Sequence, residues 1–159
     1  MEQKTLSRWL KLAIVLVGVC GLFVCGFAVP AYGRSLVSLY PEFSNRYAPW
    51  LIFLTVTALP CFAALIIGWR IAVNIGHDRS FSFENARMLK WISWLAAGDS
   101  VFFFIGNAAL LFMNMSHPGI VLFSLFFVLA GAAVTAAAAA LSHLVRKAAA
   151  LQEQSDLTI

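Results

Sequence analysis

The chain has 159 residues, of which 62% are hydrophobic and 11% are charged, and its mean hydropathy is +0.87. Soluble domains are nearer half apolar and a quarter charged, so this composition excludes an ordinary soluble protein and indicates an integral membrane protein. The formal net charge is +4, but the basic residues cluster at the ends of apolar runs, where the bilayer accounts for them. We therefore expect contact with the lipid bilayer and no direct nucleic-acid binding.

The first predicted span covers residues 12–32 and follows a short basic start. As a helix it measures roughly 30 Å, which is enough to cross a bilayer core. A cleaved signal peptide is the competing interpretation. The apolar run is longer than a signal-peptide core, however, and Val29-Pro30-Ala31 is a poor cleavage site, so we expect an uncleaved membrane helix.

Residues 34–48 form the expected outer loop, and their apolar and aromatic side chains predict a segment that lies along the membrane surface. The second span covers residues 49–69 and is expected to continue as a helix to Ile75. Pro60 removes a hydrogen bond within this span and predicts a kink. The kink serves either helix packing or a hinge.

A polar cytoplasmic loop at 76–90 separates the second span from the third. Ser82 is expected to cap a helix that begins one residue later, and Glu84 in the first turn favours the helix dipole. Two interpretations of Glu84, Asn85 and Arg87 stay open. They are helix-start residues and topology charges, or they contact a cytoplasmic partner.

The third span covers residues 91–115 and the fourth covers 120–144, with a strong turn signal at Pro118-Gly119 between them. The fourth span is rich in alanine from Ala130 onward, and its helical pattern continues past the apolar segment. We expect this helix to protrude from the bilayer into a cytoplasmic tail, residues 145–159.

The distribution of Lys and Arg predicts the orientation of the chain. If both termini and the central loop share one side, the other side holds only Arg34 and Arg46 of the eleven basic residues. The remaining nine are Lys4, Arg8, Lys11, Arg70, Arg79, Arg87, Lys90, Arg146 and Lys147. Basic residues stay on the cytoplasmic side, so the sequence predicts an all-α, single-domain membrane four-helix bundle in the plasma membrane with cytoplasmic N and C termini.

Asp99 is the one acidic residue inside an apolar run, where an ionised carboxylate is costly. At about 100° per residue, Asn107 and Asn114 share one flank of the predicted helix with Asp99. One interpretation of this polar seam is interhelical hydrogen bonding that locks the bundle. The other is a proton- or ligand-responsive site.

No residue pattern indicates an enzyme, a metal site or a cofactor. The chain has no nucleophile with a base, no paired carboxylates and no phosphate-binding glycine loop. His77, His117 and His143 do not form a cluster, because His117 falls on the opposite side of the membrane. All three cysteines lie inside apolar runs, where thiols behave as small hydrophobes.

Several short stretches match a known family in their order and spacing. They are Pro41-Glu42-Phe43, Phe81-Ser82 followed by Leu89 and Ile92, Pro118-Gly119, and the tail residues Ala149, Leu151, Glu153, Asp156, Leu157, Thr158 and Ile159. With these stretches the chain resembles the bacterial membrane proteins of domain-of-unknown-function family 2975. The resemblance implies a four-helix membrane module, and because family members often lie beside a small helix-turn-helix regulator, it also implies a regulatory pair.

The leading hypothesis is a non-catalytic sensory or regulatory module of the bacterial plasma membrane that engages a cytoplasmic partner, such as a small DNA-binding regulator. Its candidate contact residues are Glu84, Asn85, Arg87, Asp156, Leu157, Thr158 and Ile159. The alternative is a small transporter or channel subunit that uses the polar seam around Asp99. Four helices enclose little volume, so this alternative requires a homo-oligomer.

Overall fold

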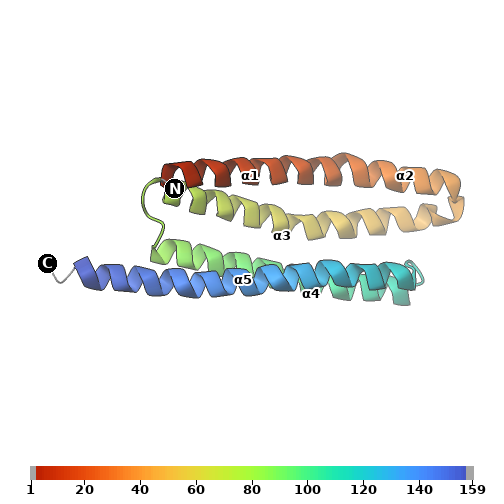
Figure 1. The fold of residues 1–159 in the computed structure, drawn as a ribbon. Helices are drawn as coiled ribbons and strands as arrows, with labels where there is room; N and C mark the ends of the chain where they lie inside the picture. The colour runs from red at the N-terminus through yellow and green to blue at the C-terminus, as the bar shows by residue number, and fades with distance from the viewer. Residues whose placement is uncertain (1–2, 157–159) are drawn as a thin grey trace.

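A computed structural model describes residues 3–156, and every regular element in this range is a helix (Figure 1). The elements are α1 (Gln3–Phe23), the π-helical turn η1 (Val24–Ala28), α2 (Val29–Leu39), the 3-10 turn η2 (Pro41–Phe43), α3 (Ser44–Gly76), α4 (Phe83–Phe112) and α5 (Pro118–Asp156). Four helical segments of 37, 33, 30 and 38 residues are long and apolar enough to cross a membrane. This confirms the predicted all-α fold with four candidate spans.

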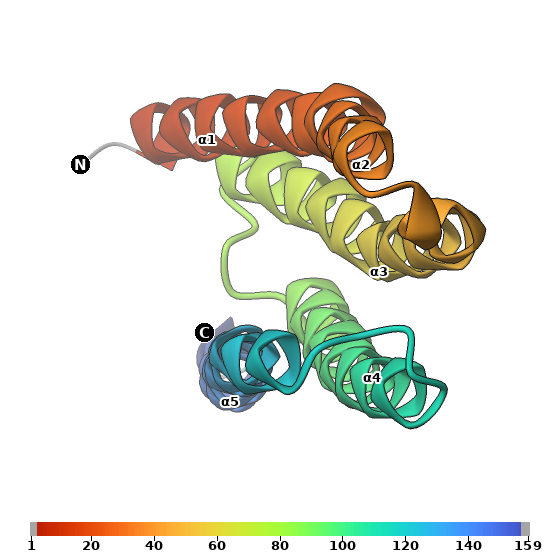
Figure 2. The same cartoon turned by 90° about the vertical axis from the view of Figure 1, so that its right-hand side faces the viewer.

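The four long segments are arranged as an open row (Figure 2). Helix α1 packs on α3, α3 packs on α4, and α4 packs on α5, whereas α1 and α5 do not touch within residues 3–156. The pairing of α4 with α5 includes two hydrogen bonds between helices. The Ser93 hydroxyl donates to the Thr135 carbonyl over 3.0 Å, and the Ser142 hydroxyl donates to the Ala86 carbonyl over 2.6 Å. Such bonds and the small side chains around them allow close packing of helices in lipid.

Both described ends of the chain and the connection between α3 and α4 lie at the same end of the molecule (Figure 1). Helix α5 extends past its neighbours there, because Ser142 lies opposite Ala86 in the antiparallel pair and α4 begins only three residues before Ala86. The part of α5 beyond the start of α4 is therefore about ten residues, or roughly 15 Å, long. This protruding end supplies one side of the candidate site.

The outer connection is much shorter than the predicted loop at 34–48. Helix α2 continues to Leu39 and α3 begins at Ser44, so much of the expected loop is helical. The helix ends at Tyr40, which has φ −133° and ψ 82°, because a residue that precedes proline disfavours the helical conformation. The expectation of a segment lying along the membrane surface is corrected accordingly: the chain reverses over Tyr40–Phe43.

Pro30 explains the π-helical turn that joins α1 to α2. Proline has no amide hydrogen, and its ring crowds the carbonyl group four residues earlier, here that of Gly26. The helix widens at this point, and the Val29 amide donates to the Val24 carbonyl, five residues back. Helix α3, by contrast, continues as one helix through both Pro49 and Pro60.

Candidate partner-binding surface

The chain leaves α3 through a hydrogen-bonded helix end that fixes the direction of the loop. The Asp78 amide donates to the Ile75 carbonyl over 3.2 Å, and the Arg79 amide donates to the Asn74 carbonyl over 3.0 Å. This is the Schellman arrangement, with Asp78 in the left-handed conformation at φ 58°. Aspartate tolerates this conformation better than most residues, so no glycine is needed here.

Asn85 anchors the other side of the loop. Its side chain is 1% exposed, its amide nitrogen donates to the carbonyls of Arg79 and Ser80 over 2.9 and 3.1 Å, and its oxygen accepts from Asn74 over 2.8 Å. The Asn85 backbone amide donates to the Ser82 hydroxyl over 3.2 Å, which confirms Ser82 as the N-cap of α4. Asn85 therefore positions the loop from inside and has almost no surface with which to contact a partner.

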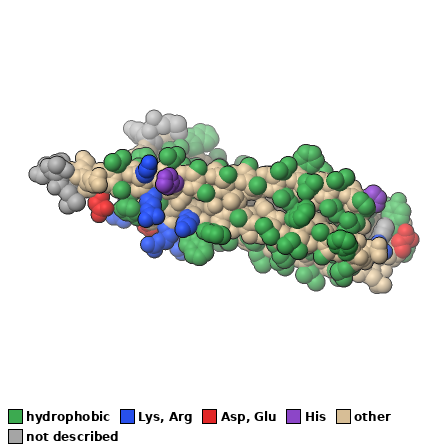
Figure 3. Space-filling model, turned by 90° about the horizontal axis from the view of Figure 1, so that it is seen from below, with side chains coloured by type: hydrophobic (Ala, Val, Ile, Leu, Met, Phe, Trp, Pro, Cys, Tyr) green, Lys and Arg blue, Asp and Glu red, His purple; other side chains and the backbone are tan. Residues whose placement is uncertain are grey.

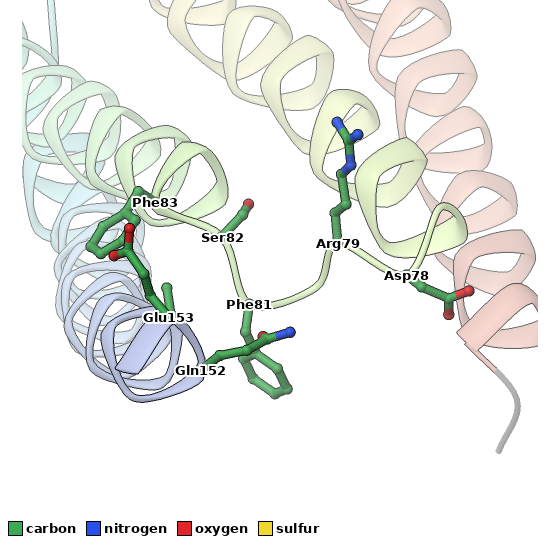
Figure 4. Close-up of a pocket in the computed structure, with 8 residues that line it drawn as sticks. Asp78, Arg79, Phe81, Ser82, Phe83, Gln152 and Glu153 are labelled. Atoms are coloured by element: carbon green, nitrogen blue, oxygen red, sulfur yellow. The ribbon is translucent and has the colours of Figure 1, made fainter. Parts of the chain in front are cut away.

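The loop and the protruding end of α5 together line an open, solvent-facing cavity of about 400 Å³ (Figure 4). The loop–tail surface, as we call its lining, consists of Asp78, Arg79, Phe81, Ser82, Phe83, Ala149, Gln152 and Glu153. Figure 4 shows Phe81 and Phe83 on the side of α5, near Gln152 and Glu153, and Asp78 and Arg79 on the side of α3. Two segments about seventy residues apart in the sequence thus form one surface.

The chemistry of the loop–tail surface suits recognition. Phe81 is 57% exposed and Phe83 is 47% exposed, and both lie next to the cap of α4. Aromatic side chains surrounded by charged and amide groups are typical of protein interfaces. The lining contains no nucleophile paired with a base, and the residues that the structure describes include no group of three His, Cys, Asp or Glu side chains able to hold a metal ion.

The other predicted contact residues lie beside this surface or outside the described range. Glu84 and Arg87 are exposed in the first turns of α4 but do not line the cavity. Asp156 is the last residue of α5, and Leu157, Thr158 and Ile159 lie outside the described residues. Partner contact through Glu84, Arg87 and the tail stays a prediction.

Asp99 lies halfway along α4 and faces α3. The Cys61 thiol donates to Asp99 Oδ2 over 3.7 Å. The second carboxyl oxygen, Oδ1, is buried and has no hydrogen-bond partner among the described residues. The carboxyl group therefore links α3 to α4 through one oxygen, while its second oxygen is buried without a hydrogen bond among the described residues.

The structure does not bring Asn107 and Asn114 to Asp99. Asn107 is buried and donates to the Phe103 carbonyl of its own helix over 2.8 Å. Asn114 is exposed in the turn after α4 with φ 55°, and the next amide, that of Met115, donates back to the α4 backbone. This is a second Schellman end, in which asparagine occupies the left-handed position. Asn107 thus bonds to its own helix, and Asn114 ends that helix.

The predicted contact residues and the residues that line the cavity belong to the same loop but overlap little. Phe83, Gln152 and Glu153 line the cavity, although none of them was a predicted contact residue. A usable signal was present: Phe81 and Phe83 are exposed aromatic residues in a polar loop outside every apolar run. The approach of α5 to this loop carries no local sequence signal.

Comparison with known proteins agrees with a membrane location. A family model described as "Protein of unknown function (DUF2975)" matches residues 31–159. The chain is also 31% identical over 155 residues to the "Uncharacterized membrane protein YoaS" of Bacillus subtilis (strain 168). The aligned region covers 95% of this chain and 96% of that protein. No solved structure shows a significant match. Together with the four helices able to span a bilayer, these similarities establish a multi-pass membrane protein.

Proposed function

The chain belongs to the membrane protein family described as protein of unknown function DUF2975, and we propose that it is a non-catalytic module whose loop–tail surface binds a soluble cytoplasmic partner. One observation carries this proposal. Two exposed phenylalanines are held at fixed positions, outside the apolar spans, against the protruding end of α5. Exposed apolar side chains held in fixed positions are unfavourable in water, and such surfaces commonly mark sites of protein–protein contact.

The charge distribution supports a cytoplasmic location for this surface. The end of the molecule that holds the loop and both described chain ends also carries nine of the eleven basic residues. Figure 3 shows Lys and Arg side chains gathered toward that end. Because basic residues are preferentially retained in the cytoplasm, this asymmetry supports a cytoplasmic position for the loop–tail surface.

The partner proposed is a small helix-turn-helix regulator, the class that the family resemblance implies. A short amphipathic helix of such a protein fits the surface, because its apolar face can cover Phe81 and Phe83 while a basic side chain pairs with Glu153. In this arrangement the membrane protein holds the regulator at the bilayer. A signal sensed by the spans would change how strongly it is held.

The test is co-purification of the tagged protein with a small helix-turn-helix regulator in mild detergent. Phe81→Ser and Glu153→Lys should each reduce the amount of regulator recovered at least about fivefold while leaving membrane insertion unchanged. Removal of Ser155 to Ile159 should weaken capture as well. The matched controls are Met113→Ser, exposed at the far end of α4, and Glu42→Lys in the outer connection. Equal recovery with all variants would contradict the proposal.

A second candidate function rests on the unpartnered oxygen of Asp99. A polar group inside a span usually faces a partner, a cavity or a transported species, and Asp99 Oδ1 has no partner among the described residues. An oligomer of this chain would hold one such carboxyl group in each copy, at the contact between α3 and α4. This is the basis for the alternative of a small transporter or channel subunit.

A further inference from the structure

Helix α4 carries two cations and two tryptophans on one exposed face. Lys90 and Trp91 follow Arg87 by three and four positions, and Trp94 follows them by four and three, the spacing at which side chains become neighbours on a helix. Trp91 is 59% exposed and Trp94 is 65% exposed, and the four side chains line a hollow of about 570 Å³. The face that packs within the protein is a different one, since it contains the buried residues Ala86 and Ser93.

The two cations are available for an external anion. Neither Arg87 nor Lys90 forms an ion pair or a hydrogen bond through its side chain with any residue in the described range. Glu84, one turn before Arg87, is exposed and does not pair with it. Two positive charges one helical turn apart repel each other when neither forms an ion pair, and an anion bound between them removes that repulsion.

The tryptophans indicate the depth of this hollow in the bilayer. Trp69 lies seven residues before the end of α3 and Trp91 lies eight residues after the start of α4, which places both about 10–12 Å from the connecting loop. Lys11 on α1 lies 5.8 Å from the centre of the Trp69 ring. Three helices therefore carry a tryptophan or a cation at one height, as is typical of the headgroup region.

We propose that the hollow formed by Arg87, Lys90, Trp91 and Trp94 binds the headgroup phosphate of an anionic phospholipid in the leaflet nearest the chain ends. The guanidinium and ammonium groups donate hydrogen bonds to the phosphate oxygens, and the tryptophan rings pack along the glycerol and upper acyl chains. The cations lie nearer the connecting loop and the tryptophan rings lie deeper in the bilayer, an order that matches the headgroup and acyl chains of a lipid. A free anion would contact the cations and leave the rings uncovered. This hollow shares no lining residue with the loop–tail surface, although Arg87 is also a predicted partner-contact residue.

Native mass spectrometry of the purified full chain tests the proposal with phosphatidylglycerol and phosphatidylcholine of identical acyl chains. Wild type should bind phosphatidylglycerol more tightly than phosphatidylcholine. In the double variant Arg87→Gln, Lys90→Gln, the ratio of the two affinities should fall about tenfold. The matched control is Arg146→Gln with Lys147→Gln, which removes the same charge from α5. The single variant Lys90→Gln, a milder change, should lose about threefold.

Three results would overturn the lipid site. The first is equal binding of both lipids by the wild type, and the second is the same loss of preference in the two double variants, which would reflect net charge alone. In the third, inorganic phosphate at matched ionic strength displaces the lipid at low millimolar concentration, so that the hollow is a site for free anions. Retained preference in the α5 control with loss in the α4 variants supports the proposal.

Discussion

At the scale of single residues, polar side chains inside these helices mostly serve the backbone. The hydroxyl groups of Ser7, Ser93 and Ser142 each donate to a carbonyl of a neighbouring helix, namely those of Ala72, Thr135 and Ala86. These bonds add directional contacts in an environment where apolar packing alone gives little preference for protein over lipid. Small serine side chains also let the helix backbones approach closely.

Gly106 shows how little room the contact between α3 and α4 leaves. A side chain at this position would collide with the Phe53 ring, whose Cζ atom would lie 2.7 Å from an added Cβ. Gly106→Ala should lower the free energy of unfolding by about 1–3 kcal/mol, because the ring has to shift. Thermal unfolding in detergent measures this loss. Gly98→Ala, on the same helix with nothing within 4 Å of an added Cβ, should be neutral or slightly stabilising.

Asp99 separates the two proposed functions. If its role is to link α3 to α4, Asp99→Asn should preserve expression and melting temperature, and Asp99→Leu should destabilise by roughly 1 kcal/mol. Thermal melts of both variants and of Cys61→Ala, which removes the observed partner, measure the link. A transport activity that disappears in Asp99→Asn while protein level and stability stay normal would favour the transporter or channel alternative.

At the scale of elements, the loop between α3 and α4 is built as a rigid joint. A Schellman end stops α3, Ser82 caps α4, and Asn85 joins both helices to the loop carbonyls. The Ser80 hydroxyl also donates to Gln3 over 2.7 Å, which ties the start of α1 to the same loop. The joint holds Phe81 and Phe83 in place although both are exposed.

Asn85→Ala should disrupt this joint more than any exposed loop substitution. It removes the partner of the Asn74 amide and leaves the Arg79 and Ser80 carbonyls without their donor, at a cost of about 1–3 kcal/mol. A lower melting temperature and faster proteolytic cleavage between residues 77 and 83 are the expected observations. Ser80→Ala, which loses a single exposed hydrogen bond, is the control and should melt within a degree or two of wild type.

At the scale of the whole molecule, the open row leaves much apolar surface uncovered. The described helices bury few large side chains, and their aromatic and aliphatic residues point outward. Lipid covers such a surface without the penalty that water would impose, so a row of helices is stable in a bilayer. The same row exposes α1 and α5 as flanks available to a second copy of the chain.

The orientation of the whole molecule is tested with a reporter active only in the periplasm. Fusion after Ser44, in the outer connection, should give activity, and fusion after Ser80, in the loop between α3 and α4, should give none. The reason is the asymmetry of basic residues, nine against two. Activity after Ser80 would reverse the orientation and remove the basis for a cytoplasmic partner.

Much of the fold follows from local sequence, and the candidate site follows only in part. Ser82 and the start of α4 were predicted correctly because a cap depends on a few adjacent residues. The outer connection was predicted too long, because its apolar and aromatic side chains suit a surface segment as well as two helix ends, and the helix-ending effect of Pro41 on Tyr40 was not considered. The sequence leaves Asn85 open as a helix-start or contact residue, because its burial depends on Asn74, which approaches from the preceding helix.

The sequence by itself determined that this is a membrane protein with four long helices and that its basic residues gather at one end. These properties depend on apolar run length, local caps and charge counts, each of which acts over one or two helical turns. Only the tertiary structure decided that the helices form an open row, that Asp99 meets Cys61, and that the end of α5 completes a surface with Phe81 and Phe83. Those outcomes depend on how helices far apart in the chain pack side by side, and a fully apolar helix can turn almost any face toward a neighbour.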